Sequence, residues 1–347
     1  MEEHRGKIGA PAITAAVAVD GEVVWQGAVG WADIDARRPA SPATVFRIGS
    51  TSKAITSTAL ARLVDKGEID LDTPISDYLR EAPYEAWATI TPRMLASHMA
   101  GVPHYSDNQD VLGFYETGAL QRHYPDVRGA LSVFDESPLL FGPGTDFEYS
   151  SLGTVLLGAA MSDAVGKPYR EIIRDEVILP GNMTSTVVAP KHADPERDHA
   201  TPYFTDGTRY RSWRPIDLSH RLPGGGWAST STDLVRMGSK WLDESYISKE
   251  TRELFWTPQS LASGEINEQD YAIGWRWREY DVEGVGVARN ANHGGVSRGA
   301  QSWLLVFPDY NMAVAFNINS KTDEFQEFGS FYEEIFREFA LATKPSE

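Results

Sequence analysis

Near the beginning of the chain, the hydrophobic positions form two strand-like runs on either side of a turn. An apolar, β-branched run covers residues 13–19, and a second extended run continues from residue 22 to Trp31. The Asp20-Gly21 pair between them is typical of a two-residue hairpin turn. We therefore predict an antiparallel pair of strands in this part of the chain.

Strand-like patterns return after residue 271. They cover residues 273–277, 285–287, 301–307 and 312–317, with a turn at 308–311. The last segment, 324–341, has the period of an amphipathic helix. Its apolar side consists of Phe325, Phe328, Phe331, Ile335 and Phe339. Because a lone hairpin is only marginally stable, strands from both ends of the chain are expected to join one sheet.

A helix is predicted directly after Ser50. Its apolar residues recur at the spacing of one buried stripe, and they are Ile55, Ala59, Leu60, Leu63 and Val64. Lys66 and Gly67 then form the stop signal of a helix C-terminus. Ser50 consequently lies at or near the helix N-terminus, where unpaired N–H groups and the helix dipole favour negative charge.

From about residue 71 to 236, Pro and Gly separate short helical segments. The predicted helices cover 74–79, 92–99, 154–165 and 169–177. Thr91 is predicted to cap the second of them, with Pro92 at its first position. Thr230-Ser-Thr-Asp233 is a capping box for a helix that ends near 241. Residues 101–142 mix aromatic residues, Gly and Pro, and we predict an irregular pocket wall there.

Together these elements predict an α/β (α+β) fold, in which a central antiparallel sheet is flanked by helices and joined to a mostly helical second lobe. The helix after Ser50 and the C-terminal helix are expected to cover the sheet. The sheet domain would be discontinuous, from residues 1–70 and 235–347, and the helical lobe would comprise 71–234. A cleft is expected between the lobes, with Ser50 close to it.

Composition narrows the classes of function. The chain has 347 residues and a formal net charge of −17, which argues against nucleic acid or an anionic membrane as a partner. The absence of cysteine excludes disulfides, thiolate catalysis and zinc–thiolate sites. No signal peptide or membrane span is visible, so we expect a cytoplasmic protein as given, with a trimmed secreted or periplasmic protein as the alternative. The oligomeric state is unknown from the sequence.

Ser50 and Lys53 form an S-x-x-K pair at the start of the predicted helix. Residues three apart on a helix face the same side, so the lysine amine reaches the serine hydroxyl. A serine becomes a good nucleophile when a neighbour accepts its proton, and a desolvated lysine at a cationic helix end loses its own proton near neutral pH. The same spacing also fits a Ser N-cap followed by a surface lysine.

Two later segments add polar groups. Tyr149 and Ser151 lie just before a predicted helix, and His293, Gly294 and Gly295 lie just before a predicted strand. Taken singly, Tyr149 fits a half-buried packing residue and His293 fits a loop or core histidine. The glycine pair permits a close backbone approach or forms a turn.

In combination, Ser50-x-x-Lys53, Tyr149-x-Ser151 and His293-x-Gly295 resemble the motifs of one family. It is the serine β-lactamase and penicillin-binding-protein-like hydrolases, in their class C-like, esterase (peptidase S12-type) branch. Segments 71–79, 95–103 and 225–233 resemble three further motifs of that family. The six motifs occur in the family's order along nearly the whole chain. The resemblance also implies the two-lobed β-lactamase/transpeptidase-like fold.

The resemblance implies a serine hydrolase that forms an acyl-enzyme on Ser50. Lys53 and Tyr149 would share the general-base work, and the sequence does not assign which of them is the primary base. The backbone N–H groups of Ser50 and Val296 would form the oxyanion hole, with Gly295 beside them. No metal or organic cofactor is expected.

Two positions depart from the family pattern. Ser151, which with His293 would position the substrate, replaces an Asn that usually bonds a substrate amide. His293 replaces a Lys that helps to hold a substrate carboxylate. We therefore expect a small-molecule ester or amide as the substrate, with short esters cleaved faster than β-lactams. A β-lactamase, a D-amino-acid-specific peptidase or acyltransferase, and an inactive binding or assembly scaffold remain alternatives.

Other chemistries lack their motifs. The chain contains no G-x-S-x-G elbow, H-E-x-x-H, P-loop or G-x-G-x-x-G. His192, Asp194, Asp198 and His199 form a small cluster, but its spacing matches no known metal site. We expect a solvated loop there and predict no metal site.

Overall fold

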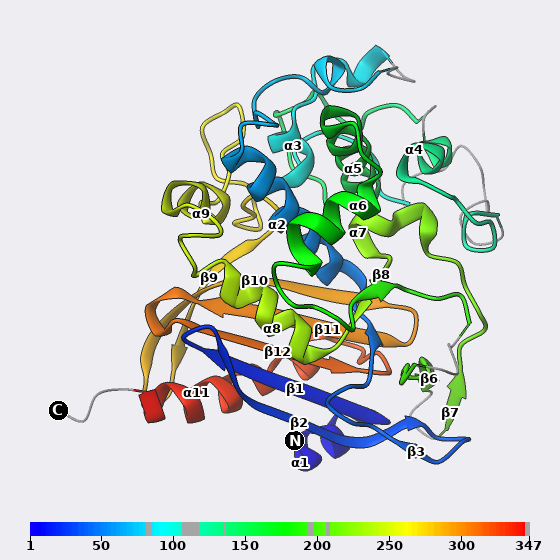
Figure 1. Cartoon of the computed structure of the whole chain (residues 1–347), viewed down its shortest axis with the longest axis vertical. Coiled ribbons are helices and arrows are strands. Elements are labelled where there is room, and N and C mark those ends of the chain that lie inside the picture. Colours follow the sequence, from blue (N-terminus) through cyan, green and yellow to red (C-terminus); the bar gives the residue numbers. More distant parts are fainter. Residues whose placement is uncertain (81–84, 106–117, 135–136, 193–196, 206–208, 344–347) are drawn as a thin grey trace.

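The computed structural model describes residues 1–80, 85–105, 118–134, 137–192, 197–205 and 209–343. At its centre is a seven-stranded sheet in the order β3-β2-β1-β12-β11-β10-β9, and all neighbouring strands are antiparallel. The strands are β1 (Ala12–Val19), β2 (Glu22–Asp33), β3 (Arg38–Pro39), β9 (Arg276–Val282), β10 (Gly286–Ser297), β11 (Ala300–Phe307) and β12 (Met312–Ile318). The two ends of the chain therefore share one sheet, with β1 beside β12, which confirms the predicted fold class (Figure 1).

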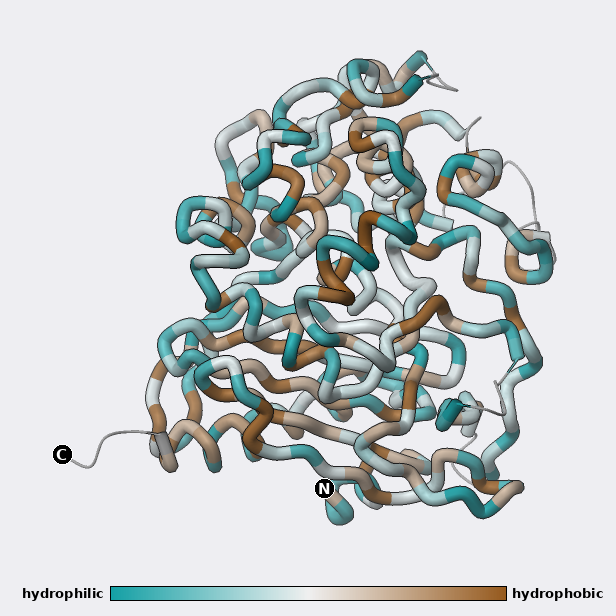
Figure 2. Tube along the Cα trace, viewed as in Figure 1, coloured by the Kyte–Doolittle hydropathy of each residue, from teal (hydrophilic) through white to brown (hydrophobic). Residues whose placement is uncertain are grey.

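The central strands are buried on both faces. Leu305 and Phe307 of β11 belong to the core on one face of the sheet, whereas Leu304 and Val306 belong to the larger core on the other. Successive side chains of a strand point to opposite faces, so a strand covered on both sides needs a continuous apolar run. Hydrophobic segments accordingly run along these strands in Figure 2.

Helices cover both faces of the sheet (Figure 1). On one side lie α1 (Glu2–Lys7), α10 (Phe325–Gly329) and α11 (Phe331–Thr343), and on the other lies α8 (Ser231–Lys240). The prediction of a single C-terminal helix was wrong, because the segment divides after Gly329. A Cβ atom at Gly329 would lie 2.6 Å from the ring of Trp303, so this glycine permits close packing while it weakens the helix.

The helix after Ser50 is α2 (Ser52–Asp65), and it leads from the sheet into the helical lobe. The predicted single stripe was incomplete, because every residue from Ser52 to Ala61 is buried. The buried hydroxyls of this helix have partners: Ser57 Oγ donates to Ile273 O at 2.6 Å. The helix ends at Asp65, and Gly67 follows with φ +69°, as the stop signal predicted.

The second lobe consists of short helices and turns. They are α3 (Pro92–Ala96), α4 (Val127–Ala130), α5 (Ser151–Val165), α6 (Tyr169–Ile173), α7 (Leu222–Gly225) and α9 (Lys249–Trp256). The remaining short strands are β4 (Phe46–Arg47), β5 (Val187–Val188), β6 (Tyr203–Thr205), β7 (Tyr210–Ser212) and β8 (Trp227–Ser229). Of these, β6 and β7 lie near the β3 end of the large sheet (Figure 1). Thr91 and Thr230 cap their helices as predicted. Within the predicted pocket wall, residues 106–117 and 135–136 lie outside the described residues. The domain boundaries stay a prediction.

Two strand predictions near the candidate site were wrong. β9 begins at Arg276 and not at residue 273, because Gly274 turns the chain with φ +77° and Ala272 N bonds Trp275 O at 2.8 Å. β10 begins at Gly286 and continues to Ser297, so His293 lies inside a strand and not before one.

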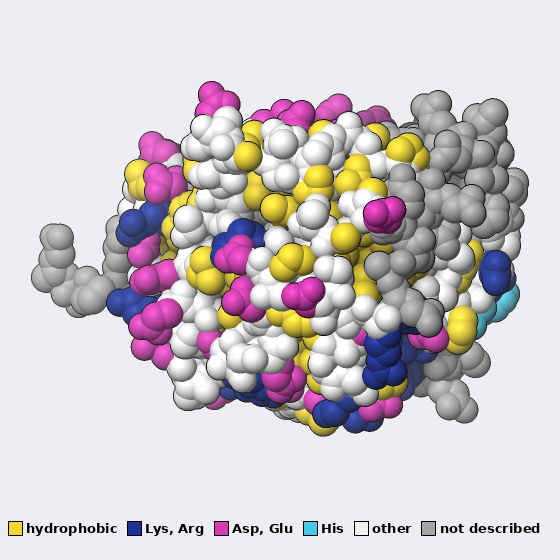
Figure 3. Space-filling model, turned by 90° about the horizontal axis from the view of Figure 1, so that it is seen from above, with side chains coloured by type: hydrophobic (Ala, Val, Ile, Leu, Met, Phe, Trp, Pro, Cys, Tyr) yellow, Lys and Arg dark blue, Asp and Glu magenta, His cyan; other side chains and the backbone are white. Residues whose placement is uncertain are grey.

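The outer surface of the helical lobe carries acidic side chains that are spread over it rather than gathered in one patch (Figure 3). Among the described residues, every helix is too short or too polar to span a membrane.

Candidate active site

Ser50 lies in a 3₁₀ turn, Gly49–Thr51, which comes directly before α2. Gly49 has φ +51°, and a Cβ atom there would lie 2.5 Å from the carbonyl oxygen of Val296. Gly295 is equally restricted, since its Cβ atom would lie 1.9 Å from the carbonyl oxygen of Ile48. The two glycines therefore allow β10 to lie directly against the turn that carries Ser50.

Lys53 lies one turn along and is 2% exposed. Its Nζ atom is 3.3 Å from Ser50 Oγ, 2.9 Å from Ser151 Oγ and 2.9 Å from the carbonyl oxygen of Gly224. The reading of Lys53 as a surface lysine was therefore wrong. Burial lowers the pKa of Lys53 well below its usual value, and the positive charges of Arg221 and Arg276 lower it further.

Tyr149 and Ser151 flank the start of α5. Ser150 between them caps the helix by accepting a hydrogen bond from Gly153 N. Tyr149 is half-buried, and its ring lies 4.6 Å from Lys53 Nζ. Desolvation raises the pKa of Tyr149, while the charge of Arg276 and a hydrogen bond with Ser50 oppose the rise. The structure thus brings Ser50, Lys53, Tyr149 and Ser151 together.

His293 is placed differently from the other predicted site residues. Its side chain is 0% exposed, on the side of β10 that faces the protein interior. Its Nε2 atom lies 2.8 Å from the hydroxyl of Tyr271, and its Nδ1 atom lies 2.8 Å from Gly294 O. Burial lowers the pKa of His293 well below its usual value. The neighbouring Gly294 and Val296 line the cavity beside Ser50 instead, and Val296 is 40% exposed.

That cavity has a volume of about 450 Å³ and includes Ser50 and Tyr149. Its aromatic wall consists of Tyr105, Tyr280, Trp303 and Phe325. A larger cavity of about 810 Å³ lies elsewhere, between β2 and α8, and contains none of the site residues predicted from the sequence. The smaller cavity is therefore the candidate active site, because the possible nucleophile opens into it.

Sequence reasoning missed two arginines in this cavity, Arg276 and Arg278. Arg278 pairs with Asp270 at 3.1 Å. The Arg276 guanidinium lies 5.5 Å from the Tyr149 ring centroid and donates to Gln269 Oε1 at 3.0 Å, and no described residue forms an ion pair with it. Arg276, Arg278 and Tyr280 alternate along β9 and therefore lie on one face, but the predicted strand ended at residue 277 and so did not include Arg278 and Tyr280.

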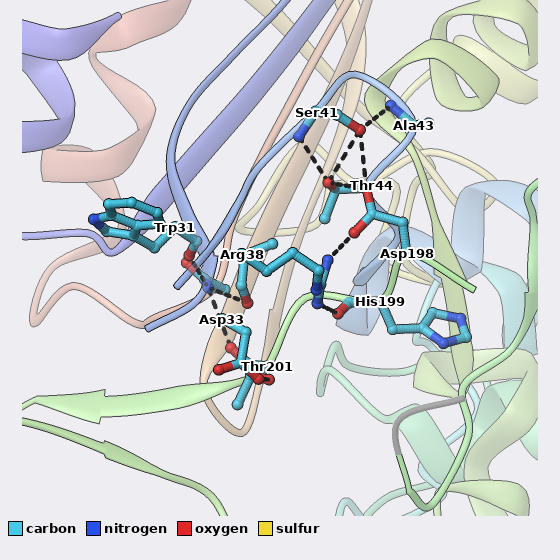
Figure 4. Close-up of polar contacts among 11 residues, drawn as sticks. Trp31, Asp33, Arg38, Ser41, Ala43, Thr44, Asp198, His199 and Thr201 are labelled. Carbon is cyan, nitrogen blue, oxygen red and sulfur yellow. Dashed lines mark hydrogen bonds and ion pairs between the residues drawn. The ribbon is translucent and has the colours of Figure 1, made fainter. Parts of the chain in front are cut away.

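The predicted histidine and acidic cluster forms no metal site among the described residues. Asp194 lies outside them, and His192 is exposed. Asp198 instead accepts hydrogen bonds from Ser41 Oγ at 2.9 Å and Thr44 Oγ1 at 2.6 Å, and Arg38 also bonds it (Figure 4). At Asp198, the expected solvated loop is therefore held by hydrogen bonds to the segment from Arg38 to Thr44.

An antiparallel sheet, an adjoining helical lobe and a Ser–Lys–Tyr cluster at the start of the central helix define the serine hydrolases of the β-lactamase/transpeptidase-like fold. The comparison with known families agrees. Residues 1–333 match the model of the Beta-lactamase family, and the chain belongs to that family.

The known proteins that resemble this chain carry names of different activities. The chain is 28% identical to the mitochondrial serine beta-lactamase-like protein LACTB of Homo sapiens, over 89% of this chain and 71% of that protein. It is 34% identical over 209 residues to esterase EstB of Burkholderia gladioli, covering 58% of this chain and 51% of the esterase. D-amino acid amidase of Ochrobactrum anthropi SV3 has a similar structure, with a TM-score of 0.77, 21% identity and coverage of 98% and 95%. The chain is thus similar in sequence to a protein named as an esterase and similar in fold to a protein named as an amidase.

Proposed function

We propose that this chain is a serine hydrolase that cleaves small esters or amides through an acyl-enzyme on Ser50. The contact of 3.3 Å between Lys53 Nζ and Ser50 Oγ carries the proposal. Ser50 lies at a helix start and lines the cavity. Its partner, Lys53, is buried and has a pKa well below its usual value. A serine with such a neighbour is an activated nucleophile.

Lys53 is the base in this proposal. A neutral lysine amine has two N–H groups and one lone pair. Gly224 O can only accept, and Ser151 Oγ lies at the same distance of 2.9 Å, so these two oxygens take the N–H groups. The lone pair then faces Ser50, whose O–H proton passes to Lys53 as Ser50 Oγ attacks the acyl carbon. In this arrangement Ser151 orients Lys53.

Tyr149 is the acid in this proposal. Its raised pKa keeps the phenol protonated near neutral pH, so the O–H can be given to the leaving group. Lys53, which holds the Ser50 proton, restores the proton on Tyr149. For hydrolysis of the acyl-enzyme, water attacks the acyl carbon, its proton passes to this pair, and Ser50 leaves with a proton. Backbone N–H groups of Ser50 and Val296 would stabilise the negative oxygen at each step.

The cavity suggests what the substrate carries. Its aromatic wall suits an apolar acyl or leaving group, while Arg276 and Arg278 bring positive charge close to Ser50. The sequence argument for short esters over β-lactams assumed that His293 was the group in place of a carboxylate-binding lysine. Because two guanidinium groups lie in the cavity, we propose that the preferred esters or amides bear a carboxylate.

The test is to treat the protein with a fluorophosphonate probe and to measure its intact mass, for the wild type and for Ser50→Ala. We expect one adduct on the wild type, none on Ser50→Ala, and loss of p-nitrophenyl ester hydrolysis in that variant with an unchanged melting temperature. An unlabelled wild type without hydrolysis of esters, nitrocefin or D-amino-acid amides would support an inactive scaffold. Hydrolysis by Ser50→Ala at the wild-type rate would refute the proposed nucleophile.

A further inference from the structure

One histidine bonds the chain on both sides of Tyr149. Glu148 N donates to the carbonyl oxygen of His98 at 3.0 Å, and Ser150 N donates to His98 Nδ1 at 3.2 Å. The rings of His98 and Tyr149 also pack together, with centroids 4.3 Å apart. His98 therefore accepts hydrogen bonds from the backbone N–H groups of the residues before and after Tyr149, and its ring contacts the ring of Tyr149.

The backbone of His98 is strained, and the strain makes this double contact possible. His98 follows the C-cap of α3 and has φ +62°. Met99 N bonds Met94 O at 2.8 Å and His98 N bonds Leu95 O at 3.4 Å, which is the pattern of a Schellman motif. Glycine is preferred at such a position because other residues are strained there. A histidine at this position points to a function for its side chain.

The imidazole of His98 must be neutral to make these contacts. Nδ1 accepts a hydrogen bond, so the ring proton lies on Nε2. His98 is 3% exposed, and burial lowers its pKa well below the usual value, as do the charges of Lys53 and Arg276. The ring also packs on Tyr271 in an edge-on arrangement, with centroids 4.5 Å apart. A protonated ring would lose the acceptor that holds Ser150 N.

We propose that His98 is the positioning residue for Tyr149: it fixes both flanking amides and the ring, so that the phenol stays in reach of Ser50. The proposal rests on the proposed role of Tyr149 as the general acid. His98 has no contact with the substrate in this scheme and acts through Tyr149 alone. Small displacements of a catalytic group lower the rate strongly, so losing His98 should affect kcat more than KM.

Two substitutions separate the side chain from the backbone strain. His98→Gly removes the imidazole and relieves the strain at φ +62°, so the variant is expected to fold. In His98→Asn the amide oxygen takes the place of Nδ1 as the acceptor for Ser150 N, and asparagine tolerates this backbone conformation. If His98 served only the stability of the fold, the Asn variant would not be expected to restore kcat.

The experiment measures kcat and KM for p-nitrophenyl butyrate with His98→Gly and His98→Asn, each alone and combined with Tyr149→Phe. We expect His98→Gly to lower kcat about 10- to 100-fold with KM nearly unchanged. His98→Asn should recover most of that loss. In the Tyr149→Phe background, His98→Gly should cause no further loss, because the group that it positions is absent.

The outcomes distinguish the two proposals. If Tyr149→Phe keeps the wild-type kcat, Tyr149 is not the general acid, and the positioning role of His98 is refuted as well. If Tyr149→Phe is impaired but His98→Gly lowers kcat equally in both backgrounds, only the positioning role is refuted. The same follows if His98→Asn is no better than His98→Gly while both variants melt at the wild-type temperature.

Discussion

The hydroxyl of Tyr271 donates a hydrogen bond of 2.8 Å to Nε2 of His293. The direction follows from the other ring nitrogen, because Nδ1 lies 2.8 Å from Gly294 O, which can only accept. Both side chains are fully buried. His293 therefore links the strand beside Ser50 to the aromatic cluster behind Tyr149, and it does not line the cavity.

Tyr271→Phe is predicted to lower stability and to leave substrate binding unchanged. The substitution leaves a buried acceptor on His293 without its partner, which costs about 1–3 kcal/mol in the free energy of unfolding. Urea denaturation measures that loss, and the KM for p-nitrophenyl butyrate should stay at the wild-type value. Tyr210→Phe, at an exposed tyrosine, is the control. A raised KM for His293→Ala at unchanged stability would instead support contact between His293 and the substrate.

Lys53→Ala and Tyr149→Phe are each predicted to lower kcat by a factor on the order of 10²–10⁴, the range for a lost general acid or base. The two groups handle the same proton, so the double variant should lose far less than the product of the single losses. Lys66→Ala, at the exposed end of the same helix, should retain full activity. A double variant whose loss equals the product of the two would show that the groups act independently.

Arg276→Gln is predicted to change substrate preference. The test compares two esters of equal acyl length, p-nitrophenyl valerate and mono-p-nitrophenyl glutarate, of which only the second carries a carboxylate. The ratio of kcat/KM for glutarate over valerate should fall about 10- to 100-fold, as expected for a lost charged hydrogen bond of about 1.5–3 kcal/mol.

Arg289→Gln serves as the control for Arg276, because Arg289 is exposed and pairs with Asp309 outside the cavity. If Arg276→Gln lowers kcat/KM equally for both esters, Arg276 does not recognise a carboxylate.

Stability is predicted to fall as the pH falls from 7 to 5. Burial lowers the pKa of His104 and His220 to about 3, and it lowers the pKa of His98 and His293 well below the usual value. These histidines stay neutral in the folded protein but gain protons in the unfolded chain below about pH 6.5. The unfolded state therefore binds more protons, and each such histidine contributes up to about 1.4 kcal/mol per pH unit.

Urea denaturation between pH 7 and 5 measures this slope. His220→Gln should reduce the slope by the share of one histidine, whereas substitution of the exposed His192 should leave it unchanged. A free energy of unfolding that is constant over this range would contradict the prediction.

The sequence by itself determined the features that depend on neighbours along the chain. The Asp20-Gly21 turn, the caps at Thr91 and Thr230 and the helix stop at Gly67 follow from residues within a few positions of one another. The spacing of Ser50 and Lys53 also belongs here, because one helical turn brings them together. The strands at both ends of the chain, and hence the fold class, followed from strand-like apolar runs separated by turn residues.

Tertiary structure alone decided which side chains meet across the chain. The pairing of β9 with β10, in which Arg276 lies opposite Asn292, decides which side of β9 faces the cavity and thereby places Arg276 in it. His293 faces inward because β10 extends through it, and His98 reaches the two amides beside Tyr149 from a turn some fifty residues earlier. Such contacts depend on strand register and on the path of the chain between distant segments, and no local pattern of residues records either one.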